Sequence, residues 1–200
     1  EIERYGRYLD VDGDGICWRT LPGTHPTRGA FFTRGSSKNE YAAYTESGED
    51  YVRNMDRLLR KWETAKSMVP EPVLYPLAET CHVGVIFFGT STASTLEAIE
   101  YLEEEESIRV EGLRLRALPF GEAVLRFIND HEQVFLVEQN RDAQMRTLLV
   151  NELGLAPQRL HSILHYDGMP ITARYIQRAI QSELASQGLE PIGRLAQGGL

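Results

Sequence analysis

The sequence predicts an α/β protein whose core is a mostly parallel β-sheet with helices on both faces. Two observations support this prediction. Short runs of apolar residues, typical of strands buried on both faces, recur from residue 82 onward, and segments with helical spacing lie between them. Strands that alternate with helices imply crossover connections, which produce parallel strands and a three-layer αβα architecture.

The N-terminal part of the chain lacks this regular pattern. Residues 1–48 are rich in Gly, Ser, Thr, Arg and Asp, and structureless stretches of this length are uncommon inside a compact domain. Apolar residues recur at helical spacing only from about 49 to 67, where we predict one helix. A linker follows that contains Pro70, Pro72 and Pro76. We therefore interpret residues 1–80 as an irregular connecting segment with a single helix.

Residues 81–186 are predicted to form the α/β domain. Strands are expected at 82–88, 110–118, 134–137 and 160–164. Helices are expected after Gly89–Thr92, at 122–129, around 145–153 and after Thr172. The hydroxyls of the Gly89–Thr92 segment and of Thr172 are expected to cap their helices, and Gly154 is expected to end the third. Residues 187–200 are expected to be a flexible tail.

Composition excludes several classes of protein. The net charge of −8 and the acidic run at 103–106 argue against a nucleic-acid surface. No apolar run approaches the roughly 18 residues that span a bilayer. Cys17 and Cys81 lie far apart without a CxxC spacing, so neither a disulfide framework nor a zinc site is expected, and this usage suits a reducing cytoplasm. The chain opens without Met, and we expect a fragment.

One loop resembles the start of a calcium-binding loop. Asp10, Asp12 and Asp14 occupy the first, third and fifth positions, and Gly15 occupies the sixth. The twelfth position, where a bidentate Glu is needed, is Leu21. We interpret the loop as a polar turn and predict no metal site in the chain.

Polar side chains in the N-terminal segment are candidates for contact with a ligand or another subunit. They are His25, Arg28, Arg34, Lys38 and Asn39. Two arginines can hold a carboxylate or a phosphate by bidentate donation. The same side chains can equally form salt bridges between subunits or domains, so both readings stay open.

A second group of candidates follows buried strands of the predicted sheet. Glu138, Asn140 and Arg141 come after the strand at 134–137, where sites of α/β proteins lie. The alternative is a helix cap and a dimer contact. Gly89–Thr92 lies at another strand-to-helix junction, where free N–H groups can bind a phosphate, although hydroxyl capping explains the same residues.

Several long segments together resemble a known family. They are RYLDVDGDGICWRTLPGTHPTRGAFFTRGSSKNEYAAYTE, YVRNMDRLLRKWETAK, VEGLRLRALPF, VFLVEQNRDAQMRTLL and LHYDGMPITARYI. In wording and order they resemble the α subunit of 2-oxoacid:ferredoxin oxidoreductases, especially the 2-oxoglutarate type. In that family such segments form the C-terminal portion of the subunit, where a connecting region precedes a domain similar to the transketolase C-terminal domain. Lys38 departs from the family's GSSHNEY, which has His at this position.

The resemblance implies the activity of a larger enzyme. Such an enzyme depends on thiamine diphosphate and Mg²⁺, decarboxylates a 2-oxoacid such as 2-oxoglutarate oxidatively, passes electrons through an iron–sulfur cluster to ferredoxin and forms an acyl-CoA from coenzyme A. The family's YPITP and RGGPSTG motifs have no counterpart here. We therefore expect no cofactor in this chain and no activity from it alone.

The resemblance also implies partners: the β subunit, a second α subunit and, indirectly, ferredoxin, in the cytoplasm. Two other classes of function stay open at this point. One is a stand-alone phosphate- or nucleotide-binding module that uses Gly89–Thr92, and the other is a calcium-binding protein that uses the aspartate loop.

Overall fold

The computed structural model describes residues 4–27, 29, 34–78 and 81–186. The chain divides into two compact units, residues 1–69 and residues 70–200, here called the N-terminal unit and the α/β unit. The tail expected at 187–200 lies outside the described residues. No helix in the described part of the chain is both long and apolar enough to cross a membrane.

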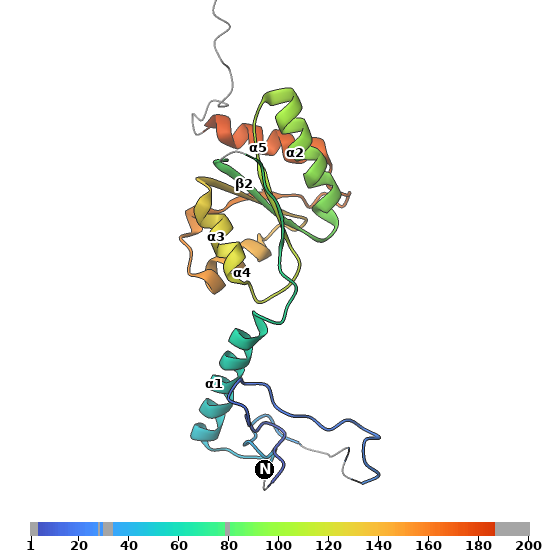
Figure 1. Ribbon diagram of the computed structural model, residues 1–200, viewed down its shortest axis with the longest axis vertical. Helices are drawn as coiled ribbons and strands as arrows, with labels where there is room; N and C mark the ends of the chain where they lie inside the picture. Colours follow the sequence, from blue (N-terminus) through green and yellow to red (C-terminus); the bar gives the residue numbers. More distant parts are fainter. Residues whose placement is uncertain (1–3, 28, 30–33, 79–80, 187–200) are drawn as a thin grey trace, which may run out of the picture. The chain divides into compact units, whose positions relative to one another are not determined.

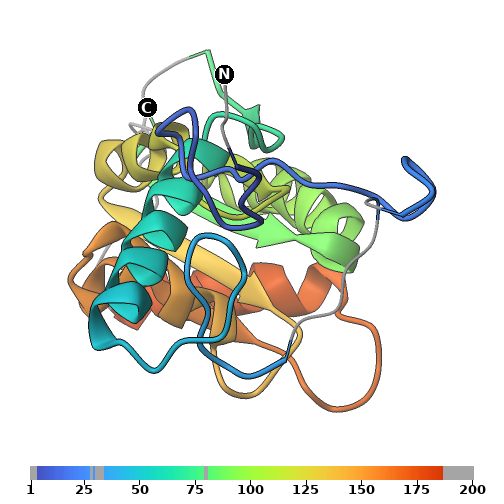
Figure 2. The same cartoon turned by 90° about the horizontal axis from the view of Figure 1, so that it is seen from below.

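The N-terminal unit consists of one helix, α1 (Gly48–Ala65), and irregular loops, some of which pack against it (Figure 2). The Ser47 hydroxyl caps the helix by accepting a hydrogen bond from the Asp50 N–H at 3.4 Å. The loop around Gly15 lies directly against α1, because a Cβ atom at this position would come within 2.3 Å of the Lys61 nitrogen. Thr64 Oγ1 donates to the Asp14 carbonyl at 2.6 Å, which ties the same loop to the end of the helix.

The α/β unit is built on a five-stranded sheet in the order β1-β3-β2-β4-β5. The strands are β1 (Val73–Tyr75), β2 (Val83–Phe88), β3 (Glu111–Leu115), β4 (Gln133–Glu138) and β5 (His161–Leu164). Strands β2 to β5 are parallel to one another, and β1 pairs antiparallel with β3. The predicted mostly parallel sheet is therefore confirmed.

Helices cover both faces of this sheet, as predicted (Figure 1). They are α2 (Thr92–Glu106), α3 (Glu122–Asp130), α4 (Gln144–Leu153) and α5 (Ala173–Ser186), with short 3₁₀ turns η1 (Gly89–Ser91) and η2 (Pro157–Arg159). Helices α2 and α5 pack on one face, and α3 and α4 pack on the other. The alternation of strand and helix places successive crossovers on both sides, which gives the three layers.

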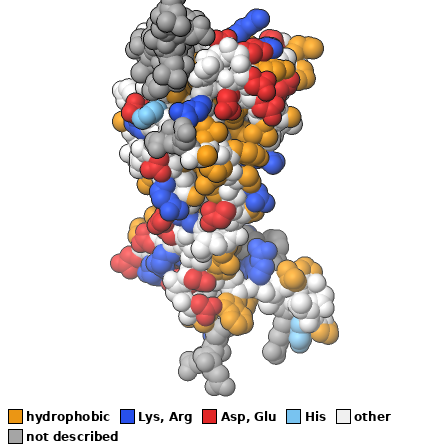
Figure 3. Space-filling model, turned by 45° about the horizontal axis from the view of Figure 1, so that its top comes forward, with side chains coloured by type: hydrophobic (Ala, Val, Ile, Leu, Met, Phe, Trp, Pro, Cys, Tyr) orange, Lys and Arg blue, Asp and Glu red, His pale blue; other side chains and the backbone are white. Residues whose placement is uncertain are grey.

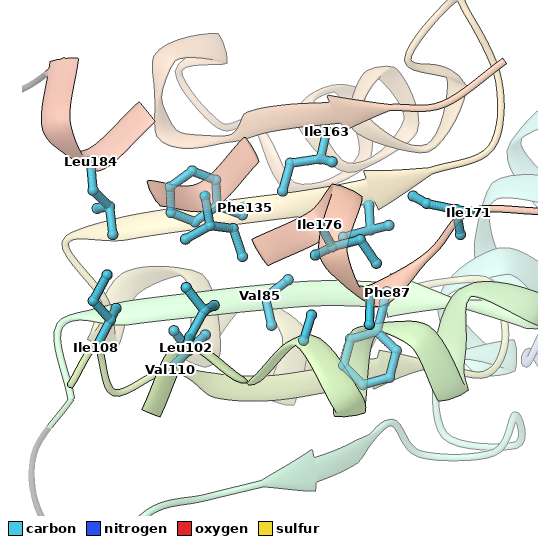
Figure 4. Close-up of a cluster of buried hydrophobic side chains, with 14 residues drawn as sticks. Val85, Phe87, Leu102, Ile108, Val110, Phe135, Ile163, Ile171, Ile176 and Leu184 are labelled. Carbon is cyan, nitrogen blue, oxygen red and sulfur yellow. The ribbon is translucent and has the colours of Figure 1, made fainter. Parts of the chain in front are cut away.

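Alternate residues of the central strands supply the two cores. Val85 and Phe87 of β2 and Phe135 of β4 pack with Leu102 of α2 and Ile176 of α5 in one cluster (Figure 4). Their neighbours along the same strands face α3 and α4; examples are Ile86, Val134 and Leu136. Because successive side chains of a strand point to opposite faces, a strand with apolar residues at every position must be covered on both.

The linker after residue 69 differs from the prediction. Val73–Tyr75 forms the edge strand β1, in which Leu74 pairs with Leu113. A segment of three residues flanked by prolines is too short to show the two-residue alternation that predicts a strand. The pairing depends on β3, which lies more than 35 residues away in sequence and offers a free edge.

The predicted hydroxyl caps after β2 are also wrong. Ser91 Oγ donates to the Phe88 carbonyl and Thr92 Oγ1 donates to the Gly89 carbonyl, both at 2.7 Å, so neither accepts from a helical N–H. The 3₁₀ turn η1 puts Ser91 already in the helical region (φ −74°, ψ −5°), from which its hydroxyl reaches back to the preceding turn. The other two terminal predictions are confirmed: Thr172 Oγ1 accepts from the Tyr175 N–H at 3.2 Å, and Gly154 ends α4 with φ 62°.

Gly84 tests the packing of β2 against α3. A Cβ atom at Gly84 would lie 2.8 Å from the Phe127 ring and 3.0 Å from His131 Cγ, which is closer than packed carbons allow. We expect Gly84→Val to lower the free energy of unfolding by about 1–3 kcal/mol in chemical denaturation. Ser162→Ala, on the exposed face of β5, is the matched control and should stay within about 0.5 kcal/mol of wild type. A Gly84→Val protein as stable as the control would show that β2 and α3 pack differently.

The contact between α2 and α5 includes an ion pair with a measurable titration. Arg174 Nη2 donates to Glu105 Oε1 at 2.8 Å, and this bond, together with one from Gln177, lowers the pKa of Glu105 from 4.5 to about 2. A lowered carboxyl pKa stabilises the folded protein above pH 4.5, and this contribution is lost as the pH falls toward 2. We expect carbon NMR titration to find Glu105 near pH 2 and to find a higher value, toward 4.5, in Arg174→Gln.

The control for this titration is Arg178→Gln, which removes an exposed charge one turn further along α5. It should leave the Glu105 pKa low. A Glu105 carboxyl that titrates near 4.5 in the wild type would contradict the ion pair.

Candidate functional site

The order of the strands creates a topological switch point, the kind of place that holds sites in α/β proteins. The chain leaves β2 through α2 to reach β3 on one side, and later enters β4 on the other side of β2. The loops after β2 and β4 therefore diverge at the carboxyl edge of the sheet. Ligands of open α/β sheets bind at such a switch point.

Hydrogen bonds between side chains and backbone groups connect the loops at this switch point. Gln139, which follows β4, donates from Nε2 to Thr90 Oγ1 at 2.8 Å and accepts at Oε1 from the Ile171 N–H at 3.3 Å. Ser94 Oγ on α2 donates to the Ile171 carbonyl at 2.8 Å. The loops after β2 and β4 and the segment before α5 are thus held together by one hydrogen-bonded set.

Glu138 is fully buried at the end of β4 and accepts hydrogen bonds from the first turn of α4. Its carboxylate accepts from the Met145 N–H at 2.8 Å, the Arg146 N–H at 3.1 Å and Asn140 Nδ2 at 2.8 Å. The residue at the N-cap position, Ala143, has no side-chain acceptor, so Glu138 supplies the negative charge that a helix N-terminus favours. The first N–H groups of α4, which at other helix N-termini can bind an anion, are therefore occupied by an internal carboxylate.

The neighbouring candidates organise the same loop. Asn140 Oδ1 accepts from the Asp142 N–H at 3.1 Å and the Gln144 N–H at 3.3 Å. Arg141 is exposed and pairs with Asp142 at 2.7 Å. The sequence pattern placed these residues at the carboxyl edge of the sheet and included Thr90 in the Gly89–Thr92 segment, but it did not predict the hydrogen bond from Gln139 to Thr90. The position of Gln139 directly after a buried strand is the one feature of the sequence that could have identified it.

The candidates of the N-terminal unit occupy local turns. Lys38 forms an isolated β-bridge with Tyr44, and Asn39 Oδ1 between them accepts from the N–H groups of Tyr41 and Ala43, each at 3.1 Å. His25 Nδ1 accepts from the Thr27 N–H at 3.1 Å within its own loop. Arg34 is exposed, and Arg28 lies outside the described residues.

The aspartate loop uses its carboxylates internally. Asp10 accepts from the Gly15 N–H at 3.0 Å and pairs with Arg60 at 3.2 Å. Asp12 accepts from Trp18 Nε1 at 2.9 Å, and Asp14 accepts from the N–H of residue 16 at 2.8 Å. The geometry is that of a hydrogen-bonded polar turn.

The described residues do not form a recognisable metal-binding site. No group of three or more His, Cys, Asp and Glu side chains among these residues is arranged to hold an ion. Burial raises the pKa of both the Cys17 and the Cys81 thiol, which keeps them protonated at neutral pH and makes them poorer metal ligands.

Comparison with known proteins gives a curated relative and a structural neighbour that bear on function. The chain is 26% identical over 153 residues to the 2-oxoacid:ferredoxin oxidoreductase subunit alpha of Saccharolobus solfataricus, an alignment that covers 74% of this chain and 24% of the relative. The chain thus spans about a quarter of the curated relative that it matches. No family model matches the chain.

The fold has a counterpart in a solved enzyme. The structure of 2-oxoglutarate:ferredoxin oxidoreductase from Magnetococcus marinus with 2-oxoglutarate, coenzyme A and succinyl-CoA bound superimposes with a TM-score of 0.75. The match covers 90% of this chain and 31% of that chain, at 20% identity. This likeness shows that the two chains share a fold.

Glu138 gives a direct test of how the sheet edge is built. Replacing Glu138 with Gln removes the negative charge and turns an N–H group toward backbone donors. We expect the free energy of unfolding to fall by about 1.5–3 kcal/mol, measured by chemical denaturation, because hydrogen bonds to a charged group are lost in a buried place. Asp142→Asn, an exposed carboxylate in the same loop, should cost at most about 1 kcal/mol. Equal effects of the two substitutions would show that Glu138 does not cap α4.

Proposed function

We propose that this chain is the C-terminal portion of the α subunit of a thiamine-diphosphate-dependent 2-oxoacid:ferredoxin oxidoreductase. The whole enzyme would decarboxylate a 2-oxoacid such as 2-oxoglutarate oxidatively, reduce ferredoxin and form an acyl-CoA in the cytoplasm. The portion described here would contribute architecture and subunit contacts, with the β subunit and a second α subunit as its partners.

One observation carries the proposal: the similarity extends over both units. The α/β unit, residues 70–200, makes up about two thirds of the chain, whereas the alignment with the Saccharolobus α subunit covers 74% of it. The aligned part must therefore include residues of the N-terminal unit. A sheet with helices on both faces is common to many functions, but an irregular segment with one helix joined to such a domain is a far more specific combination.

The side chains present support an architectural role. An iron–sulfur cluster usually takes four cysteine thiolates, and the chain has only Cys17 and Cys81, which lie in different units. The chain does not fit the cluster, and the thiamine diphosphate, Mg²⁺, cluster and coenzyme A of the proposed enzyme would be held by other parts of it. On the face drawn in Figure 3, basic and acidic side chains are interspersed, which differs from the basic surface of a nucleic-acid-binding protein.

Helix α1 offers a surface suited to assembly. Large apolar side chains on it are exposed: Leu59 by 67%, Val52 by 56% and Tyr51 by 51%. Val52 and Leu59 are seven residues apart and therefore lie on one face of the helix, and exposed apolar surface marks sites of contact between proteins. We propose that another part of the enzyme covers it.

The proposal is tested by purifying the chain from its own cells through an affinity tag, without oxygen. We expect polypeptides with a thiamine-diphosphate-binding domain to copurify, and the assembly to reduce methyl viologen when both a 2-oxoacid and coenzyme A are added. A chain that purifies alone and supports no such reduction contradicts the proposal.

A substitution on α1 distinguishes an effect on partner binding from an effect on folding. Leu59→Asp puts a charge on the exposed apolar surface of α1 and should reduce copurification of the partners severalfold, while circular dichroism of the purified chain stays unchanged. Ser182→Asp adds the same charge to an exposed position of α5 and should copurify partners like the wild type. Undiminished copurification with Leu59→Asp would show that α1 does not face a partner.

A further inference from the structure

The N-terminal unit contains a hollow between its loops and α1. Its volume is about 160 Å³, roughly five times the ~30 Å³ that one water molecule takes up in the liquid. It is lined by Tyr8, Ser36, Ser37, Lys38, Tyr51, Asn54, Met55, Arg57 and Leu58. The space is therefore large enough for a small organic molecule or a phosphate.

The charges around the hollow all have one sign. Lys38 and Arg57 are its two ionisable cations, and no Asp or Glu belongs to the lining. Hydroxyl and amide groups of Ser36, Ser37 and Asn54 add neutral donors. The remaining wall is aromatic or aliphatic.

Arg57 is the unusual residue of this set. Its side chain is only 8% exposed, Nη1 donates to the Gly15 carbonyl at 3.0 Å, and Nε is buried without a hydrogen-bond partner. Among the described residues, no carboxylate lies within 4.0 Å of it. A buried guanidinium without a counter-ion is costly, because desolvation is not offset by an opposite charge.

The other arginines of the same helix differ. Arg53 contacts Glu40 at 2.7 Å, and Arg60 contacts Asp10 at 3.2 Å, and both are about half exposed. The two exposed guanidinium groups of this helix thus have carboxylate partners, and the buried one has none among the described residues. Arg57, the arginine without a carboxylate partner in the described part of the chain, is also the one that lines the hollow.

We propose that this hollow binds a small oxyanion, the carboxylate or phosphate group of a low-molecular-weight ligand. Arg57 would supply the guanidinium donors that suit either group, Lys38 would supply the second charge, and Tyr51, Met55 and Leu58 would contact a short apolar body. The inference rests on the N-terminal unit alone and stands whether or not the chain belongs to the proposed enzyme.

The test uses the full chain labelled with nitrogen-15 and follows the arginine Nε–H resonances by NMR. Inorganic phosphate and propionate are titrated separately, and sodium chloride of equal ionic strength provides the reference. We expect at least one of the two anions to shift the Arg57 resonance in a saturable way that chloride does not reproduce. Saturation by phosphate alone would identify a phosphate ligand, and saturation by propionate alone would identify a carboxylate.

Variants show whether the hollow itself binds the anion. Lys38→Met should raise the dissociation constant about tenfold or more, as expected for the loss of a charge-assisted contact. Lys61→Met removes a charge from the same helix outside the hollow and should change the constant less than about twofold. Arg57→Met should abolish binding. If Arg57→Met also unfolds the unit, as judged from its spectrum, the comparison of the two lysine variants decides.

Two results would overturn the inference. One is the absence of any saturable shift with either anion beyond that of chloride. The other is equal weakening by Lys38→Met and Lys61→Met, which would show that only the general charge of the surface attracts anions.

Discussion

The parallel pairing of β2 with β4 is the interaction on which the rest of the α/β unit depends. Residues 83–86 of β2 lie beside residues 133–136 of β4, in the centre of the sheet. Both strands carry apolar side chains on both faces, so each requires a helical layer above and below. The two hydrophobic cores, the crossover connections and the position of the switch point all follow from this arrangement.

The same pairing determines what the carboxyl edge of the sheet can do. It brings the ends of β2 and β4 together, and there Gln139 joins Thr90 while Glu138 serves the first turn of α4. In other α/β proteins ligands bind at this edge of the sheet. In this chain the polar groups there form hydrogen bonds with one another. The N-terminal unit has the opposite character, because its helix exposes Leu59 and Val52 and buries Arg57, which has no carboxylate within 4.0 Å among the described residues. Features that point to something outside the chain are therefore concentrated in that unit.

Sequence reasoning predicted the elements that depend on local pattern and missed those that depend on distant contacts. The apolar runs at 82–88 and 134–137 predict buried strands because period and composition suffice. Strand β1 was not predictable, since Val73–Tyr75 becomes a strand only through β3. The direction of the Ser91 and Thr92 hydroxyls depended on a 3₁₀ turn that residue types do not reveal. Arg57 was missed because a charge on an amphipathic helix is expected in solvent, and its carbonyl partner lies 42 residues away.

The central claim is that this chain supplies architecture to a larger enzyme, with its sheet edge closed by its own side chains. Electron cryomicroscopy of the assembly purified through the chain, with a 2-oxoacid and coenzyme A added, tests the claim most directly. The account predicts that another part of the enzyme covers the exposed apolar side chains of α1 and that Gln139 still contacts Thr90. Ligand density between Gln139 and Thr90, or a particle that contains this chain alone, would contradict it.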